Sequence, residues 1–139
     1  MDERQARAAT MRRPLRLLAA TLATGLTMLS LDLTWIGKVA RPFYAALGQL
    51  QRAEPYLPAA VAFYAMYLTA VMVHAVRPAA SPSAALVRGG GLGFVCYATH
   101  ELTNWAVIEG WPGALVPVDI AWGVFLTGVS AGVGRRVLG

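Results

Sequence analysis

Charged residues are scarce in this sequence. Only 14% of its 139 residues are Asp, Glu, Lys or Arg, whereas 57% are hydrophobic. Soluble proteins carry roughly 25% charged residues. The shortage is concentrated in long apolar segments, so it excludes an ordinary soluble domain and leaves no room for one beside a membrane domain.

Other features of secreted proteins and soluble enzymes are missing as well. The single cysteine, Cys96, cannot form an intrachain disulfide. The run Gly89-Gly90-Gly91 lacks the following Lys-Ser/Thr pair and the preceding strand of a phosphate loop, so it predicts close helix packing. The net charge of +5 reflects arginines distributed by membrane side. We therefore expect neither a nucleic-acid partner nor a cofactor.

The sequence does contain four apolar segments, each with about the 20 residues that a helix needs to cross a bilayer. They predict an all-α membrane protein, a bundle of four transmembrane helices. The expected spans are 14–37, 55–76, 84–108 and 114–134, in a single domain at 14–136 that follows a polar cytoplasmic tail at 1–13. The short turn at 109–113 makes the last two helices antiparallel neighbours.

Loops and basic residues predict the orientation. Phe43, Leu47 and Leu50 have helical spacing, which favours a short interfacial helix in the first periplasmic loop. With four spans, one side receives only Lys38, Arg41 and Arg52, and all other Lys and Arg residues fall on the opposite side. The positive-inside rule then places both termini in the cytoplasm of a multi-pass protein of the bacterial inner membrane, with the lipid bilayer as its first partner.

Two similar motifs place an aspartate inside an apolar run. LDLTWIG (31–37) contains Asp32, VDIAWG (118–123) contains Asp119, and the third span carries Glu101. At 1.5 Å per residue, all three acids lie about 7–11 Å below the outer boundary. An acid in hydrocarbon costs ~2.5 kcal/mol or more, so such residues face the bundle interior or water.

We therefore predict a polar pocket with aromatic walls in the outer leaflet. Tyr97, Glu101 and Asn104 share one helix face, and no basic residue shares the level of the acids. The candidate pocket residues are Asp32, Trp35, Tyr97, His100, Glu101, Asn104, Asp119 and Trp122. No metal site is expected, because neighbouring residues on a helix point ~100° apart and His100 and Glu101 cannot easily share an ion. Trp105 and Trp111 are expected to be interfacial anchors.

Three functions remain open at this stage. Carboxyls with aromatic walls suit binding or transport of a cation, a proton or an amine headgroup, with a homodimer supplying a wider pathway. Alternatively, the acids only hold together a structural or accessory subunit that docks on other membrane proteins. A membrane-embedded enzyme acting on lipids would use Glu101 and His100 as acid and base, but no Ser or Cys nucleophile lies at that level.

The motifs also resemble a known family. LDLTWIG at 31–37, RPFY at 41–44, YATHELTNWA at 97–106, GWP at 110–112 and VDIAWG at 118–123 are similar to those of small bacterial membrane proteins catalogued as a domain of unknown function, family 2177. The resemblance covers about residues 17–134. It implies a four-helix membrane domain and no particular activity. The family usually has tyrosine and aspartate where this chain has His100 and Glu101.

Overall fold

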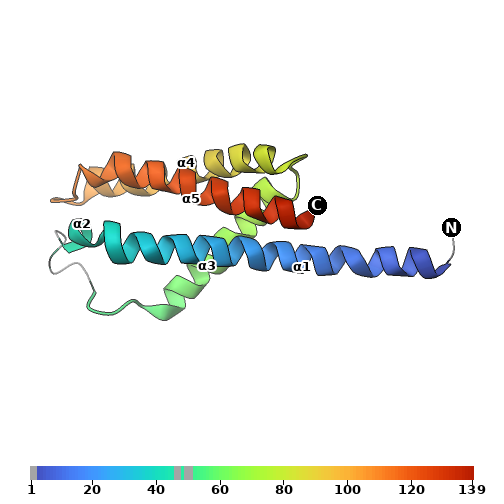
Figure 1. Cartoon of the computed structure of the whole chain (residues 1–139). Helices are drawn as coiled ribbons and strands as arrows, with labels where there is room; N and C mark the ends of the chain where they lie inside the picture. Colours follow the sequence, from blue (N-terminus) through green and yellow to red (C-terminus); the bar gives the residue numbers. More distant parts are fainter. Residues whose placement is uncertain (1–2, 46–47, 49–51) are drawn as a thin grey trace.

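The chain forms long helices that lie beside or across one another (Figure 1). The structure is a computed structural model that describes residues 3–45, 48 and 52–139. The described residues are mostly helical and contain no strand, which confirms the predicted all-α fold. The elements are α1 (Glu3–Thr34), η1 (Trp35–Val39), α2 (Arg41–Ala45), α3 (Leu57–Val71), η3 (Met72–Val76), α4 (Pro82–Val107) and α5 (Leu115–Leu138). The segments η1 and η3 are single π-helical turns that continue α1 and α3.

Helix α1 begins earlier than the sequence predicts. We expected a polar tail up to residue 13 and a helix start at Pro14, but Pro14 lies inside α1. The residues before it include Glu, Gln, Arg and Ala, all strong helix formers, which outweigh the backbone hydrogen bond that an internal proline removes. At its C-terminal end α1 widens into the π-turn η1, so the Asp32–Trp35 motif lies at the junction of an α-helix and a π-turn.

Helices α4 and α5 form an antiparallel hairpin with the most extensive interface in the molecule, as the short connection predicted. Glycines allow this close approach. A Cβ added at Gly93 would lie 2.1 Å from the Gly123 carbonyl oxygen, and one added at Gly123 would lie 2.1 Å from the Tyr97 ring. The connection between the helices contains Gly110 at φ +80°, a conformation that favours glycine.

Helix α1 packs along α5, whereas α3 crosses the bundle obliquely (Figure 1). The α1–α5 contact is close, because a Cβ at Gly134 would lie 2.0 Å from the hydroxyl of Thr24. The second span contacts α4 and α5 mainly through η3, and α3 itself touches α1 only lightly. As a result, the N-terminal half of α3 diverges from the other helices.

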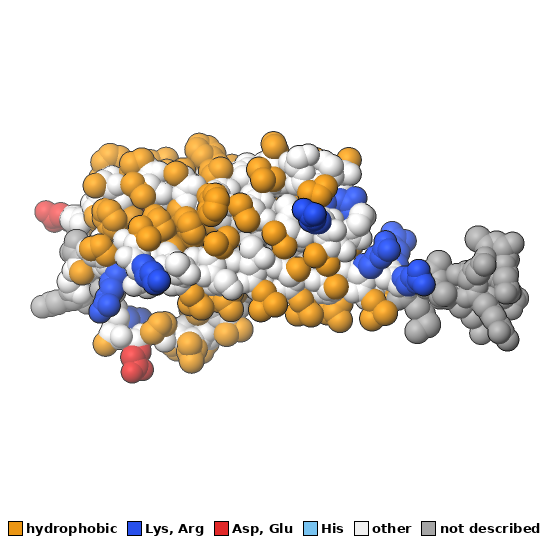
Figure 2. Space-filling model, viewed as in Figure 1, with side chains coloured by type: hydrophobic (Ala, Val, Ile, Leu, Met, Phe, Trp, Pro, Cys, Tyr) orange, Lys and Arg blue, Asp and Glu red, His pale blue; other side chains and the backbone are white. Residues whose placement is uncertain are grey.

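Large apolar side chains cover the outside of the bundle, and Figure 2 shows them over the middle of the visible face with Lys and Arg toward the ends. On α1 alone, Leu15, Leu18, Leu22 and Leu26 are each more than half exposed. Such a continuous apolar surface is rare on soluble monomers. It matches the hydrocarbon that a membrane protein contacts.

Three helices among the described residues are long and apolar enough to cross a membrane: Arg12–Val39, Leu57–Val76 and Leu115–Leu138. The fourth long helix, α4, has 26 residues, about 39 Å at 1.5 Å per residue, which exceeds a ~30 Å hydrocarbon core. It contains no 18-residue stretch as apolar as those of the other three helices, because Arg88, Glu101 and several glycines interrupt its apolar runs. The length of α4 therefore suits a membrane span, whereas its hydropathy is lower than that of the other three helices.

The expected interfacial helix between the first two spans is present only as a short segment. Helix α2 has five residues and includes Phe43 of the predicted apolar pattern. The other two members of that pattern, Leu47 and Leu50, lie outside the described residues.

Candidate functional site

Three buried carboxyls lie at the end of the bundle where α4 turns into α5. Asp32 is on α1, Glu101 on α4 and Asp119 on α5, and their exposed fractions are 7%, 0% and 4%. The inference from sequence that all three face the interior therefore agrees with the structure. No two of them come from the same helix, so the packing of three helices assembles the group.

Each of these carboxyls accepts a hydrogen bond from an aromatic side chain elsewhere in the chain. The Tyr64 hydroxyl donates to Oδ2 of Asp32 at 2.5 Å. The Trp35 Nε1–H donates to Oδ1 of Asp119 at 2.9 Å, and Trp111 Nε1–H donates to Oε2 of Glu101 at 3.0 Å. Hydrogen bonds to a charged acceptor are stronger than neutral ones, so these contacts fix the position of each carboxyl group.

The tryptophan of each similar motif lies against the aspartate of the other motif. Trp35, three residues after Asp32, binds the aspartate of the other motif, Asp119. Trp122, three residues after Asp119, approaches the Asp32 carboxyl in turn. The two indoles stack with ring centroids 4.7 Å apart and an interplanar angle of 7°. Each motif therefore supplies an acid to one half of the site and an indole to the other.

A cavity of about 310 Å³ opens beside this group, at the place where α3 diverges from the bundle. Its lining includes five of the eight predicted pocket residues, namely Asp32, Trp35, Tyr97, His100 and Asp119. The remaining lining residues are Ile36, Phe63, Met66, Tyr67 and Cys96. Ile36, Phe63 and Met66 are 43%, 40% and 67% exposed, so one wall of the cavity is continuous with the apolar outer surface.

The other three predicted pocket residues lie around the cavity. Glu101 is fully buried behind it, next to the Asp119 carboxyl. Trp122 stacks on Trp35, a wall residue. Asn104 lies outside, one helical turn beyond His100, and its amide nitrogen is 3.1 Å from His100 Nε2.

Two polar atoms of this region lack a partner in the part of the chain that is described. Oε1 of Glu101 and Nε1 of Trp122 are buried and form no hydrogen bond. Among the described residues, the only Lys, Arg or His nitrogen within 4 Å of any of the three carboxyls is Nε2 of His100, 3.9 Å from Glu101 Oε1. His100 itself is 58% exposed. The site thus contains one buried acceptor, Glu101 Oε1, and one buried donor, Trp122 Nε1–H, without a hydrogen bond to any described residue.

Sequence reasoning missed the donors that hold two of the acids. Trp111 was expected to be an interfacial anchor, but its indole binds Glu101 from the connection between α4 and α5. Tyr64 lies on α3 and Asp32 on α1, and spacing along the sequence gave no indication of a direct bond between them. Cys96 lines the cavity beside Tyr67. No three His, Cys, Asp or Glu side chains in the described ranges are arranged to hold a metal ion.

Comparison with known proteins gives one match. The model of a family described as "Predicted membrane protein (DUF2177)" matches residues 17–135. No curated protein and no solved structure matches the chain. The matched range begins in the first apolar helix and ends in the last turns of α5, so it includes all three carboxyls and both aspartate–tryptophan motifs. The chain therefore belongs to this family of membrane proteins, to which no function is assigned.

Proposed function

We propose that this protein spans the bacterial inner membrane four times, with both ends in the cytoplasm, and binds an organic cation with an amine headgroup in an outer-leaflet pocket. The observation that carries the proposal is the meeting of Asp32, Glu101 and Asp119, from three helices, beside a cavity with aromatic walls. Both chain ends lie at the opposite end of the bundle from these acids (Figure 1), which supports the proposed orientation.

Charge supports a positively charged ligand. Glu101 and Asp119 are direct neighbours, and no Lys or Arg side chain described in the structure lies within 4 Å of them. Two carboxylates that are both ionised repel strongly at close range in a medium of low dielectric constant. A cation bound in the cavity, near Asp32 and Asp119, would offset this repulsion and could use the free acceptor Glu101 Oε1 through small side-chain movements.

Size and walls favour an organic ammonium group over a proton or a bare metal ion. A volume of about 310 Å³ is at the lower end of small-molecule pockets, which span ~300–1,000 Å³. Trp35, Phe63, Tyr67 and Tyr97 surround it, and aromatic faces attract ammonium groups by ~0.5–2 kcal/mol each.

The exposed wall indicates where such a ligand enters. Ile36, Phe63 and Met66 border the cavity and also belong to the apolar outer surface. A ligand with an apolar tail could keep the tail in the hydrocarbon while its amine reaches the acids. This geometry favours an amphiphilic amine, such as an amine-bearing lipid, over a small hydrophilic cation.

A structural role is the second candidate, and one observation favours it. All three carboxyls already accept hydrogen bonds from Tyr64, Trp35 and Trp111, and these bonds join different elements. Interhelical hydrogen bonds in membranes contribute about 0.6 kcal/mol on average, which is little compensation for burying three acids. The two candidates predict different losses when Asp32 or Asp119 is replaced by Asn. An amine site predicts weaker ligand binding, whereas a structural role predicts only lower thermal stability.

Binding can be measured with octylammonium as the probe and octanol as the uncharged match. The protein is reconstituted in phosphatidylcholine nanodiscs, and the stacked Trp35–Trp122 pair provides a fluorescence signal at the cavity wall. We expect saturable quenching or enhancement by octylammonium and none by octanol. Asp32→Asn and Asp119→Asn should each weaken octylammonium binding by at least about tenfold, the effect of losing a charged partner.

The matched control is Glu109→Gln, which removes an exposed acid at the same end of the molecule. It should bind octylammonium like the wild type. Equal binding by the wild type and both aspartate variants would contradict the proposal. Lower thermal stability of those variants without any change in octylammonium affinity would establish the structural role instead.

A further inference from the structure

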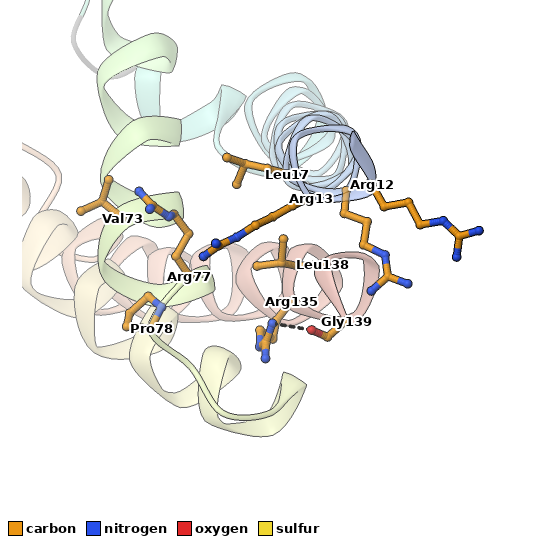
Figure 3. A pocket seen from close by; sticks show the side chains of 10 residues that line it. Arg12, Arg13, Leu17, Val73, Arg77, Pro78, Arg135, Leu138 and Gly139 are labelled. Atoms are coloured by element: carbon orange, nitrogen blue, oxygen red, sulfur yellow. Dashed lines mark hydrogen bonds between the residues drawn. The ribbon is translucent and has the colours of Figure 1, made fainter. Parts of the chain in front are cut away.

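The end of the bundle opposite the acids contains a second and larger cavity. Its volume is about 720 Å³, and it lies between α1, α5 and the residues that follow η3 (Figure 3). Five arginines line it: Arg12, Arg13, Arg16, Arg77 and Arg135. Three segments far apart in the sequence therefore direct their guanidinium groups at one hollow.

No Asp or Glu side chain is among its lining residues in the described part of the chain. Figure 3 shows Arg13 reaching from α1 across the hollow to the Arg77 side chain at the end of the second span. Two like charges that converge without a carboxylate between them repel one another. An anion between the two guanidinium groups would convert this repulsion into attraction.

Arg135 provides a second and independent observation. Its Nη1 donates a hydrogen bond at 3.0 Å to a terminal oxygen of Gly139, the last residue of the sequence, which holds the side chain against the last turn of α5. Its Nε is buried and has no hydrogen-bond partner among the described residues. A buried donor without an acceptor costs ~1–3 kcal/mol, so the site is built with a donor that the protein leaves unused.

We infer that this arginine cavity binds a phosphate-bearing anion. Guanidinium groups present two parallel N–H donors that match two phosphate oxygens, and Arg is better suited to this contact than Lys. Arg13 and Arg77 would hold the phosphate from two sides, and Nε of Arg135 would donate from the floor of the cavity. The inference is independent of the proposed amine site, which lies at the other end of the bundle.

An anionic phospholipid headgroup and a soluble phosphate compound share this chemistry. Leu17 and Val73 also line the cavity and are 37% and 45% exposed, so its rim joins the apolar outer surface. A lipid could therefore place its phosphate among the arginines while its acyl chains lie along α1 and η3.

The test is retention of phosphatidylglycerol by the purified full chain, measured by native mass spectrometry after exchange into micelles containing equal amounts of phosphatidylglycerol and phosphatidylcholine. The key variant is Arg13→Lys/Arg77→Lys, which keeps the positive charge that directs insertion but removes both paired donors. We expect the wild type to retain phosphatidylglycerol preferentially. The double lysine variant should lower that retention by at least about tenfold, the effect of losing ~1.5 kcal/mol or more of charged hydrogen bonding.

The matched control is Arg41→Lys/Arg52→Lys, which makes the same change at the other end of the molecule. Arg52 lies over the Tyr56 ring, 5.7 Å from its centroid, and neither control residue lines the cavity. The control should retain phosphatidylglycerol like the wild type. Two results would overturn the inference. One is an equal loss of phosphatidylglycerol in both double variants. The other is a wild type that neither prefers phosphatidylglycerol nor binds inorganic pyrophosphate.

Competition separates the two sources of phosphate. If millimolar inorganic pyrophosphate displaces phosphatidylglycerol from the wild type, or binds to it alone, the cavity accepts soluble phosphate compounds. If pyrophosphate leaves lipid retention unchanged, the occupant is the lipid headgroup. In both cases the Arg13→Lys/Arg77→Lys variant should lose the binding that the wild type shows.

Discussion

Glu101 shows at the level of one residue how an acid is accommodated in this bundle. It is fully buried, Trp111 donates to its Oε2, and its Oε1 has no partner in the described part of the chain. The donor comes from the connection between α4 and α5, ten residues further along the chain. Helical spacing predicts which residues share a face, but it cannot predict that a loop folds back over an acid, so this contact was not foreseen.

Replacement of Trp111 by phenylalanine tests that contact. Trp111→Phe keeps an aromatic ring but leaves the buried carboxyl of Glu101 without its donor, which should destabilise the protein by about 1–3 kcal/mol. The measurement is the thermal unfolding midpoint in detergent.

The control for this prediction is Trp105→Phe. Trp105 is 55% exposed at the same end of the molecule, and its indole lies beside Gly113. A membrane anchor in detergent should tolerate the change with little loss of stability. Equal effects of the two substitutions would show that the Trp111–Glu101 hydrogen bond contributes nothing specific.

At the level of the helices, the α4–α5 hairpin depends on glycines that face the partner helix. A Cβ at Gly93 would meet the Gly123 carbonyl oxygen at 2.1 Å and the Thr127 hydroxyl at 2.7 Å. Gly93→Ala should therefore force α4 and α5 apart and destabilise the protein by about 1–3 kcal/mol or more, because overpacking strains a well-packed interface. Thermal unfolding in detergent measures this effect.

The same helix provides the control, because nothing lies within 4 Å of a Cβ at Gly91. Gly91→Ala should leave stability unchanged or raise it slightly, since alanine is the better helix former. If Gly93→Ala were as stable as Gly91→Ala, the close hairpin described above would be wrong. Gly123 has the same role nearer the acids, because the absence of a side chain there makes room for the Tyr97 ring.

The helices were predictable from sequence to a larger extent than their contacts. Segment length and hydropathy predicted α3, α4 and α5 to within a few residues at most ends, and the constant helical rise placed Asp32, Glu101 and Asp119 at one level. The crossed pairing of Trp35 with Asp119 depends on the rotation of two helices about their axes and on side-chain rotamers. Neither quantity is encoded in local periodicity, so the pairing became visible only in the structure.

At the level of the whole molecule, the number of spans determines which leaflet of the membrane each of the two cavities faces. Three helices among the described residues meet the length and hydropathy of a span, and α4 is long but more polar. Part of its polarity faces inward, because Glu101 is buried and Gly89, Gly90 and Gly93 lie against α5, whereas Arg88 and His100 are exposed. The outward residues include Val87, Phe94 and Val95, which are 71%, 54% and 60% exposed. A helix that hides its polar groups in a partner can contact lipid despite a modest average hydropathy, so we expect α4 to span.

Accessibility of cysteines at the two ends of α4 tests this expectation. In a Cys96→Ser background, Ser81→Cys lies just before α4 and Glu109→Cys just after it. With four spans and cytoplasmic termini, a membrane-impermeant maleimide should label Glu109→Cys in intact spheroplasts and Ser81→Cys only after the membrane is opened. If both cysteines reacted from the same side, α4 would not cross the bilayer, and the acid and arginine cavities could not face opposite leaflets as proposed. If only Ser81→Cys reacted in intact spheroplasts, the four spans would stand but the orientation would be inverted, which would place the amine pocket in the inner leaflet.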